Sequence, residues 1–509
     1  MDTERLTSKP SPRKSTTRKP SARKPSSLLN MLSVYGILII FSGGIHLLSL
    51  LALPFYPDEV KEGVFIAVPS LCAMVFGAAL HFLFRRNESQ ISAKHGAVLV
   101  CLLWFTSVLI TATPYMLSGR LSFTQSFFEG MSGWTTTSMT LIDPDSLPNV
   151  LILCRSITNF FGGVGLICVV VSALSETNIM HLYNAEGHSG KLLPNLAKST
   201  RLIMSLFAAY FAVGSLAYII AGMPVFDALN YCMTALSTGG ISLSSESIAA
   251  YDSIPIEIIT MILMLLGATN FLVHMMVIKR KWQIHKVGEI RCFGILLLAG
   301  TVLISLAFFG AVYDSAGKSI RSALFNTVSI ITTTGFKTLP SHDKLPYFSL
   351  AVIVFLMFVG GSAGSTAGGI KIGRLYLICK SVVWRIKRQF MSERNTKELS
   401  VYYPQGRVFV KEEQCSETYN YVFVHITVLF IGVLILTANG YSLQDSLFDF
   451  TSVMGTVGLS SGIVTPTAPG VVLWTMSLGM FLGRLEIIVI FLAFIQVFKD
   501  AGKSLLRKP

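Results

Sequence analysis

Charged residues are scarce in this chain. They make up 13% of its 509 residues, whereas soluble globular domains carry about 25%. The eight cysteines are scattered without a C-x-x-C pair, and no two of the nine histidines have the H-x-x-x-H spacing. The sequence therefore implies no metal site of cysteine or histidine ligands and no bound cofactor.

Enzyme motifs are missing as well. Gly360 to Gly364 formally match G-x-S-x-G, but neither the strand-to-helix context of a hydrolase nor its Asp and His partners are apparent. A phosphate-binding G-x-x-x-x-G-K-[ST] loop fails because Ile370 follows Gly369. We therefore expect no enzyme.

Apolar residues are abundant: they form 52% of the chain, and its mean hydropathy is +0.62. Crossing a bilayer takes about 20 apolar residues. Ten runs approach or exceed that length, near 29–53, 64–84, 97–118, 149–174, 202–222, 256–278, 291–313, 348–390, 418–438 and 470–498. The run at 348–390 is too long for one straight span, and the glycine-rich stretch 360–369 breaks it. We predict an all-α polytopic membrane protein.

The net charge of +14 is unevenly distributed. Basic clusters at 1–27, 279–281, 371–411 and 499–508 all fall on one side of a ten-span chain. Because basic loops favour the cytoplasm, both termini should be cytoplasmic, in a cell (inner) membrane. The tail 1–27 should be disordered, as a topology determinant or a binder of anionic lipid. This distribution does not indicate nucleic-acid binding.

One short pattern recurs four times between apolar runs: SFFEGMSGWTTTSMT, ALNYCMTALSTGGIS, ALFNTVSIITTTGFK and SLFDFTSVMGTVGLS, which begin at Ser126, Ala228, Ala323 and Ser446. Ten positions after each opening residue lies a threonine, and two further on lies a glycine in three copies and Ser138 in the first. The candidate ion-binding residues are Thr136, Thr137, Ser138, Thr238, Gly239, Gly240, Thr333, Thr334, Gly335, Thr456, Val457 and Gly458.

These loops suit a cation pore for a physical reason. Backbone outside a helix survives at membrane depth only inside protein or beside water. Thr/Gly loops that follow short re-entrant helices can turn carbonyl and hydroxyl oxygens toward an axis, in place of the water around K⁺ or Na⁺. Four pseudo-symmetric helix–pore-loop–helix repeats, with an N-terminal helix pair, should therefore surround one central pore.

The repeats share one topology, which argues against the inverted repeats of many transporters. We divide the chain into the tail 1–27, a two-helix unit 28–96, pore repeats 97–200, 201–290, 291–416 and 417–499, and a C-terminal tail 500–509. The third repeat includes an intramembrane loop and a charged linker near 392–416, which is either a docking surface or solvated chain.

Further motifs carry a family resemblance over about residues 95–499: FGGVGL (161–166), GATNF (267–271), GGSAGSTAGGIKIGR (360–374) and GRLE (483–486). With the four loops, they make the chain similar to the Trk/Ktr/HKT potassium-uptake superfamily, and closest to its TrkH/TrkG-like membrane subunits. The resemblance implies K⁺ as the transported ion, a homodimer, and a TrkA-like cytoplasmic nucleotide-binding regulatory subunit.

The resemblance also implies a gate beneath the filter. Its gating loop would comprise Gly360, Gly361, Ser362, Ala363, Gly364, Ser365, Thr366, Ala367, Gly368, Gly369 and Lys371. A helix kink beside snorkelling basic residues is the alternative reading. Arg484 matches a family arginine that points into the pore, where its charge would form a barrier; a salt bridge to Glu486 is the alternative.

Three residues depart from simple expectations. Bacterial potassium members usually have glycine where this chain has Ser138, and plant relatives with serine there tend toward Na⁺, so Na⁺ permeation stays open. Lys337, just after the third filter, would oppose cations unless it pairs with Asp343. Arg155, at the outer start of a span, is expected to anchor that helix at the outer interface, and a role in the pore is the alternative.

Two mechanisms remain in competition. The first is a gated cation-selective pore, and the second is a K⁺ symporter coupled to H⁺ or Na⁺. A symporter should place a carboxylate within the membrane, and Glu486 is the strongest candidate that the sequence offers. Because Arg484 lies two residues away and would neutralise it, we favour the pore.

Overall fold

The structure is a computed structural model of the chain. It describes residues 27–85, 93–165, 196–339, 342–391, 398–485 and 487–505. The predicted disordered tail, Leu166, linker residues 392–397 and Glu486 lie outside these ranges. The salt bridge considered for Arg484 and Glu486 and the fate of the tail therefore stay predictions, as do the unit boundaries.

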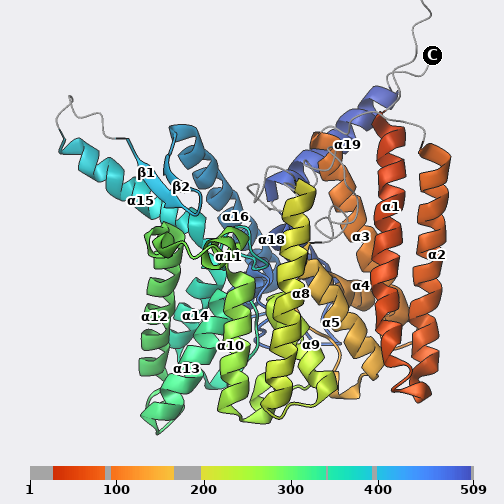
Figure 1. The fold of residues 1–509 in the computed structure, drawn as a ribbon, viewed down its shortest axis with the longest axis horizontal. Coiled ribbons are helices and arrows are strands. Elements are labelled where there is room, and N and C mark those ends of the chain that lie inside the picture. Colours follow the sequence, from red (N-terminus) through yellow and green to blue (C-terminus); the bar gives the residue numbers. More distant parts are fainter. Residues whose placement is uncertain are drawn as a thin grey trace, which may run out of the picture.

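Long apolar helices lie side by side through most of the described chain (Figure 1). Six are long enough to cross a membrane: α1 (Ser27–Leu47, continued by the short 3-10 helix η1, Leu48–Ala52), α2 (Val60–Phe84), α3 (Ala93–Leu117), α8 (Leu196–Ile220), α12 (Gly288–Phe308) and α16 (Glu412–Ala438). Two bent pairs and two shorter apolar helices overlap the remaining four of the ten predicted runs. The predicted helical, multi-pass membrane class is confirmed.

Each repeat contains a short helix between two longer segments. The four pore helices are α4 (Phe123–Trp134), α9 (Val225–Leu236), α13 (Ala316–Ile331) and α17 (Leu443–Gly455). They have 12, 12, 16 and 13 residues, fewer than the roughly 20 needed to cross a bilayer. Each is followed by its predicted Thr/Gly loop, so the chain turns back before it has crossed.

Local sequence fixes where these elements begin. Ser122 and Gln125 form a capping box at the start of α4, and Ser442 accepts a hydrogen bond from the Asp445 N–H at the start of α17. The second helix of each repeat begins at or beside a proline, which lacks the N–H that a first turn cannot use. These helices are α5 (Asn149–Val164), α10 (Ile254–Ala268), α14 (Tyr347–Val359) and α18 (Gly470–Arg484).

Three of the second helices are interrupted within the described residues, where only the third was predicted to be. α10 bends by 108° into α11 (Phe271–Ile278), and α18 bends by 108° into α19 (Ile487–Leu505). At the first bend the Asn270 side chain caps the new helix by accepting from the Leu272 N–H at 2.8 Å. The apolar runs at 256–278 and 470–498 are therefore each formed by two helices and not by one straight helix.

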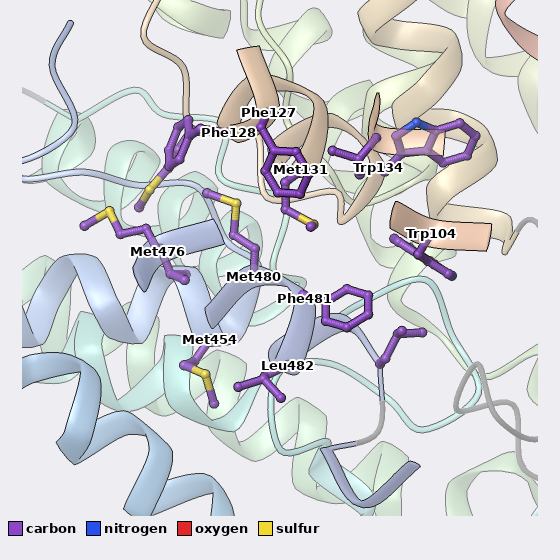
Figure 2. Packing of buried hydrophobic residues seen from close by; sticks show 14 of the residues in the cluster. Trp104, Phe127, Phe128, Met131, Trp134, Met454, Met476, Met480, Phe481 and Leu482 are labelled. Carbon is purple, nitrogen blue, oxygen red and sulfur yellow. The ribbon is translucent and has the colours of Figure 1, made fainter. Parts of the chain in front are cut away.

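The fourth repeat packs directly against the first. In Figure 2, Phe127 and Met131 of α4 lie near Met480 and Phe481 of α18, within one buried cluster. The Phe105 ring of α3 bridges the two repeats, 6.3 Å from the Phe127 centroid and 4.9 Å from that of Phe481. Because helices far apart in the chain share this cluster, the repeats close into a ring.

The charged linker contains structure that the sequence reading missed. β1 (Ser400–Tyr403) and β2 (Gly406–Phe409) form an antiparallel hairpin beside α15 (Ile372–Gln389) and α16, on the face that also carries the C-terminal end of α19 (Figure 1). We call this side of the molecule, which carries α15, the hairpin and the C-terminal end of α19, the basic face. Valine and aromatic residues on both sides of a Pro-Gln-Gly turn, within residues 400–409, were the available signal.

Candidate functional site

The four loop threonines share one unusual backbone conformation. Thr136, Thr238, Thr333 and Thr456 have φ values of 56°, 52°, 55° and 51°. A β-branched residue is an outlier there, and glycine would adopt this turn at less cost. Strain repeated in four copies points to a function for the side chain. The threonine hydroxyl is the group that glycine would not supply.

The same turn ends each pore helix. The N–H of the residue after each loop threonine donates to the carbonyl of the residue five positions before it, as in a Schellman motif, with N···O distances of 2.8 to 3.0 Å. The four donor and acceptor pairs are Thr137 with Ser132, Gly239 with Thr234, Thr334 with Ser329 and Val457 with Ser452. The residue after that again has positive φ in all four copies: 62° at Ser138, 70° at Gly240, 83° at Gly335 and 92° at Gly458.

The loops contact one another in chain order around a ring. A Cβ atom added to Gly240 would lie 1.9 Å from the Thr334 carbonyl oxygen, and one added to Gly335 would lie 1.8 Å from that of Val457. One added to Gly458 would lie 1.9 Å from the Thr137 oxygen. Each glycine therefore allows the carbonyl of the following repeat to approach, in the order two, three, four and one.

The ring opens into a cavity of about 340 Å³ on the face where the pore helices begin. Ser138 and the three glycines line it, with Asp143, Arg155 and Lys337. Lys337 is exposed, and it makes no ion pair with Asp343 among the residues described. Nearby, the Ser245 N–H donates to Asp145 at 3.2 Å and lowers the pKa of that carboxyl group, which joins the first two repeats at the rim.

On its other side the ring contacts the predicted gating loop. The Thr333 hydroxyl accepts from the Gly368 N–H at 2.9 Å, and the Thr238 hydroxyl lies 3.0 Å from that of Thr366. The hydroxyls of Thr136 and Thr456 are buried without a hydrogen-bond partner among the described atoms.

Neighbouring elements hold the gating loop in place. The Gly267 and Ala268 carbonyls, freed by the bend after α10, accept from the Thr366 and Ser362 N–H groups, both at 3.2 Å. On the opposite side, the buried Glu289 carboxylate of α12 accepts from the Ala363 N–H at 2.7 Å. The loop between α14 and α15 is therefore held by contacts from the second repeat and from α12.

Arg484 joins three repeats beneath the ring. Its guanidinium donates to the Thr366 carbonyl in the gating loop, and to the Gly162 and Gly163 carbonyls of α5 at 2.6 and 2.7 Å. Hydrogen bonds from a charged donor are among the stronger ones in proteins. Its positive charge is thus held among backbone carbonyls of the first and third repeats.

The comparison with protein families decides the identity. The profile of the TrkH family, described as "Cation transport protein", matches residues 64–503. The chain belongs to the TrkH family of cation transport proteins. The predicted resemblance is confirmed, and the match covers all four repeats.

Individual relatives agree with this membership. The chain is 30% identical to an uncharacterized cation transporter of Methanocaldococcus jannaschii, over 91% of this chain and 96% of the relative. It is 29% identical to the potassium uptake protein TrkH of Salmonella typhimurium, over 91% and 98% of the two chains. The crystal structure of the potassium transporter TrkH from Vibrio parahaemolyticus superposes with a TM-score of 0.80 at 24% identity, over 92% of this chain and 98% of that one.

Arg155 corrects one expectation. It was predicted to anchor its helix at the outer interface, but its side chain is buried and faces α4. Its guanidinium lies 3.4 Å from the Glu129 carboxylate, which is also buried. The helix begins six residues earlier, at Asn149, so Arg155 lies more than one turn inside.

Sequence reasoning missed a set of residues that brace the loops. Three positions after the opening small residue, each pore helix carries a side chain that accepts from the backbone N–H twelve residues further on. The pairs are Glu129 with Leu141, Tyr231 with Leu243, Asn326 with Thr338 and Asp449 with Ser461. The available signal was a hydrogen-bonding residue at this position in every copy.

These carboxylates also correct the expectation about buried acids. Glu486 was taken as the strongest intramembrane candidate, yet Glu129, Glu289 and Asp449 are buried beside the loops. Each already accepts from a backbone N–H. A carboxylate occupied in this way stabilises the loops, so its burial does not by itself indicate coupled proton transport.

Replacing Asp449 by alanine tests the bracing role. The half-buried Ser461 N–H would lose its acceptor, which costs up to about 1–3 kcal/mol, so we expect a lower midpoint of thermal unfolding and a lower flux. Asp449→Asn retains an oxygen for that N–H and is the matched control. Equal thermal midpoints for Asp449→Ala and the wild type, measured on purified protein, would contradict this role.

Proposed function

We propose that this chain is the membrane subunit of a potassium-uptake system and conducts K⁺ through the ring of its four Thr/Gly loops. The observation that carries the proposal is the repeated positive-φ threonine, with a loop carbonyl packed at three junctions against the glycine of the preceding repeat. Such a ring supplies hard oxygen ligands without charged side chains, which suits a monovalent cation that must leave again. The potassium uptake proteins among its relatives support this choice of ion.

The gating loop and Arg484 would form the closed barrier on the basic face. The gating loop lies against filter threonines on one side and is held by Glu289 and Arg484. Opening requires these contacts of the gating loop to break and others to form. Glycines within the loop permit the different backbone conformation that this needs. On this proposal the pore is shut in the structure described here.

A partner subunit would drive that exchange. We place both termini and the basic face in the cytoplasm of a cell (inner) membrane, following the basic linkers. A TrkA-like nucleotide-binding subunit would dock there, and a homodimer would present two such faces. A groove between α15, the β-hairpin and α16, lined by Trp384, Arg388 and Lys411, offers a surface for it.

Flux measurements in liposomes test the proposal. Purified wild-type protein should admit K⁺ down its gradient without a proton or sodium gradient, and K⁺ should exceed Na⁺. Uptake that requires either gradient would reject the pore and support the symporter.

Ser138→Gly tests the first loop, whose last filter residue is serine where the other three loops have glycine. If serine admits Na⁺, the glycine variant should raise the preference for K⁺ over Na⁺ by about fivefold, which corresponds to ~1 kcal/mol. If the wild type is already strongly K⁺-selective, the ratio should not change. A variant that loses K⁺ preference would show that serine is required at this position.

A further inference from the structure

The junction between the first two repeats is built differently from the other three. At this junction the side chain of Asn159, which belongs to α5, lies between the two loops and is fully buried. Its Nδ2 donates to the Ser138 hydroxyl at 3.0 Å, and its Oδ1 accepts from the Ser237 hydroxyl at 2.5 Å. One amide thus joins the last residue of the first filter segment to the pore helix end of the second.

The neighbouring glycine makes room for this amide. A Cβ atom added to Gly239 would lie 1.9 Å from the Asn159 Oδ1. Gly239 occupies the filter position that holds Thr137, Thr334 and Val457 in the other repeats. The second loop therefore lacks a side chain where the asparagine inserts, and the two features belong to one arrangement.

Ser138 is the other half of the arrangement. It adopts a φ of 62°, which its Cβ disfavours and which glycine adopts in the other three loops. The hydrogen bond from Asn159 offsets part of that cost. This hydrogen bond also orients the Ser138 hydroxyl toward α5, into the space between the first and second loops.

We infer that Asn159 is a selectivity-determining positioning residue, because it holds the Ser138 hydroxyl away from the ion path and fixes the spacing of the first two loops. This inference rests on the proposed cation pore. With the hydroxyl held, the first loop presents its backbone carbonyls as the glycine loops do. Without Asn159, the hydroxyl is free to turn toward the ion, and the ring can widen or contract at that junction.

A double-mutant cycle in liposomes tests the inference. Asn159→Ala should lower the K⁺ over Na⁺ flux ratio by about fivefold, the size expected for one hydrogen bond of ~1 kcal/mol. In the Ser138→Gly background the same change should lower the ratio much less, because no hydroxyl remains to be released. Rescue by removal of the serine hydroxyl is the expected signature, and loss of general packing would not produce it.

Asn230→Ala provides the matched control. Asn230 is equally buried, but it donates to the Phe226 carbonyl within its own pore helix. Its variant should retain the wild-type flux ratio. If Asn159→Ala also retains it, or if the drop is equal in both Ser138 backgrounds, the inference is wrong.

Two further measurements distinguish a change in selectivity from a failure to fold and from a failure of the pore proposal. Thermal unfolding shows whether Asn159→Ala folds, and Asn159→Gln, which keeps the amide, is used if it does not. Any fall in its ratio should be smaller than fivefold and should vanish in the Ser138→Gly background, and an equal fall in both backgrounds would contradict the inference. Absence of passive K⁺ flux both in the wild type and in Arg484→Gln, which removes the closed barrier, would instead reject the proposed function itself.

Discussion

Replacement of Arg484 by glutamine should raise resting cation flux by roughly tenfold or more. The guanidinium donates to the Thr366 carbonyl of the gating loop and to two carbonyls of α5. A hydrogen bond to a charged group contributes about 1.5–3 kcal/mol, so loss of even one from the closed state alone shifts the equilibrium by about tenfold or more. Removal of the positive charge also lowers the barrier for a cation below the ring.

Arg484→Lys separates the two contributions. It keeps the charge but lacks the planar fork that reaches several carbonyls at once. If the clamp dominates, lysine should behave like glutamine, whereas if the charge dominates, lysine should stay near the wild type. Passive K⁺ flux into liposomes, measured without a partner subunit, gives the comparison. Unchanged flux in both variants would rule out Arg484 as part of the barrier.

Gly335→Ala should reduce K⁺ flux by roughly a hundredfold. The added Cβ would lie 1.8 Å from the Val457 carbonyl oxygen, far inside contact distance. Overpacking costs about 1–3 kcal/mol, and the left-handed backbone adds about 1–2 kcal/mol for a residue with a Cβ. The third and fourth loops must then move apart, and the oxygens that line the ring lose their common centre.

Gly440→Ala is the control that isolates the collision. Gly440 has a φ of 93°, close to the 83° of Gly335, but nothing lies within 4 Å of the position of its Cβ. It should lose some stability through the same backbone strain and keep its flux. Flux of purified protein at matched reconstitution density checks both variants. Equal losses would show that strain alone, and not the ring contact, explains the effect.

The four pore loops could be located from the sequence because their chemistry is local. A short apolar helix, a Thr/Gly turn and a flanking span all lie within about 50 residues of one another, so each copy carries its own pattern. Four copies in register then reveal what no single copy would. The glycine that ends three of the four loops could also be interpreted from the sequence, since a positive φ is a requirement on a single residue.

Other features could not be read because they depend on partners far along the chain. Arg155 looked like an interface anchor until the fold placed it against Glu129. Asn159 showed nothing unusual in sequence, and only the approach of the second repeat gives it Ser138 and Ser237 together. The bends after Ala268 and Arg484 were hidden because apolar residues resume directly after the few polar ones there, so hydropathy alone does not separate the two helices.

The sequence by itself determined the class, the fourfold repeat and the family, because hydrophobic length and short motifs follow from residues near one another in the chain. Tertiary structure alone decided the order of the loops around the ring, the contact of loop 360–369 with them and the contacts of Arg484 with the first and third repeats. These depend on backbone carbonyls, which every residue carries and no sequence distinguishes. Which carbonyl faces an ion, an arginine or another loop is set only when the four repeats pack together.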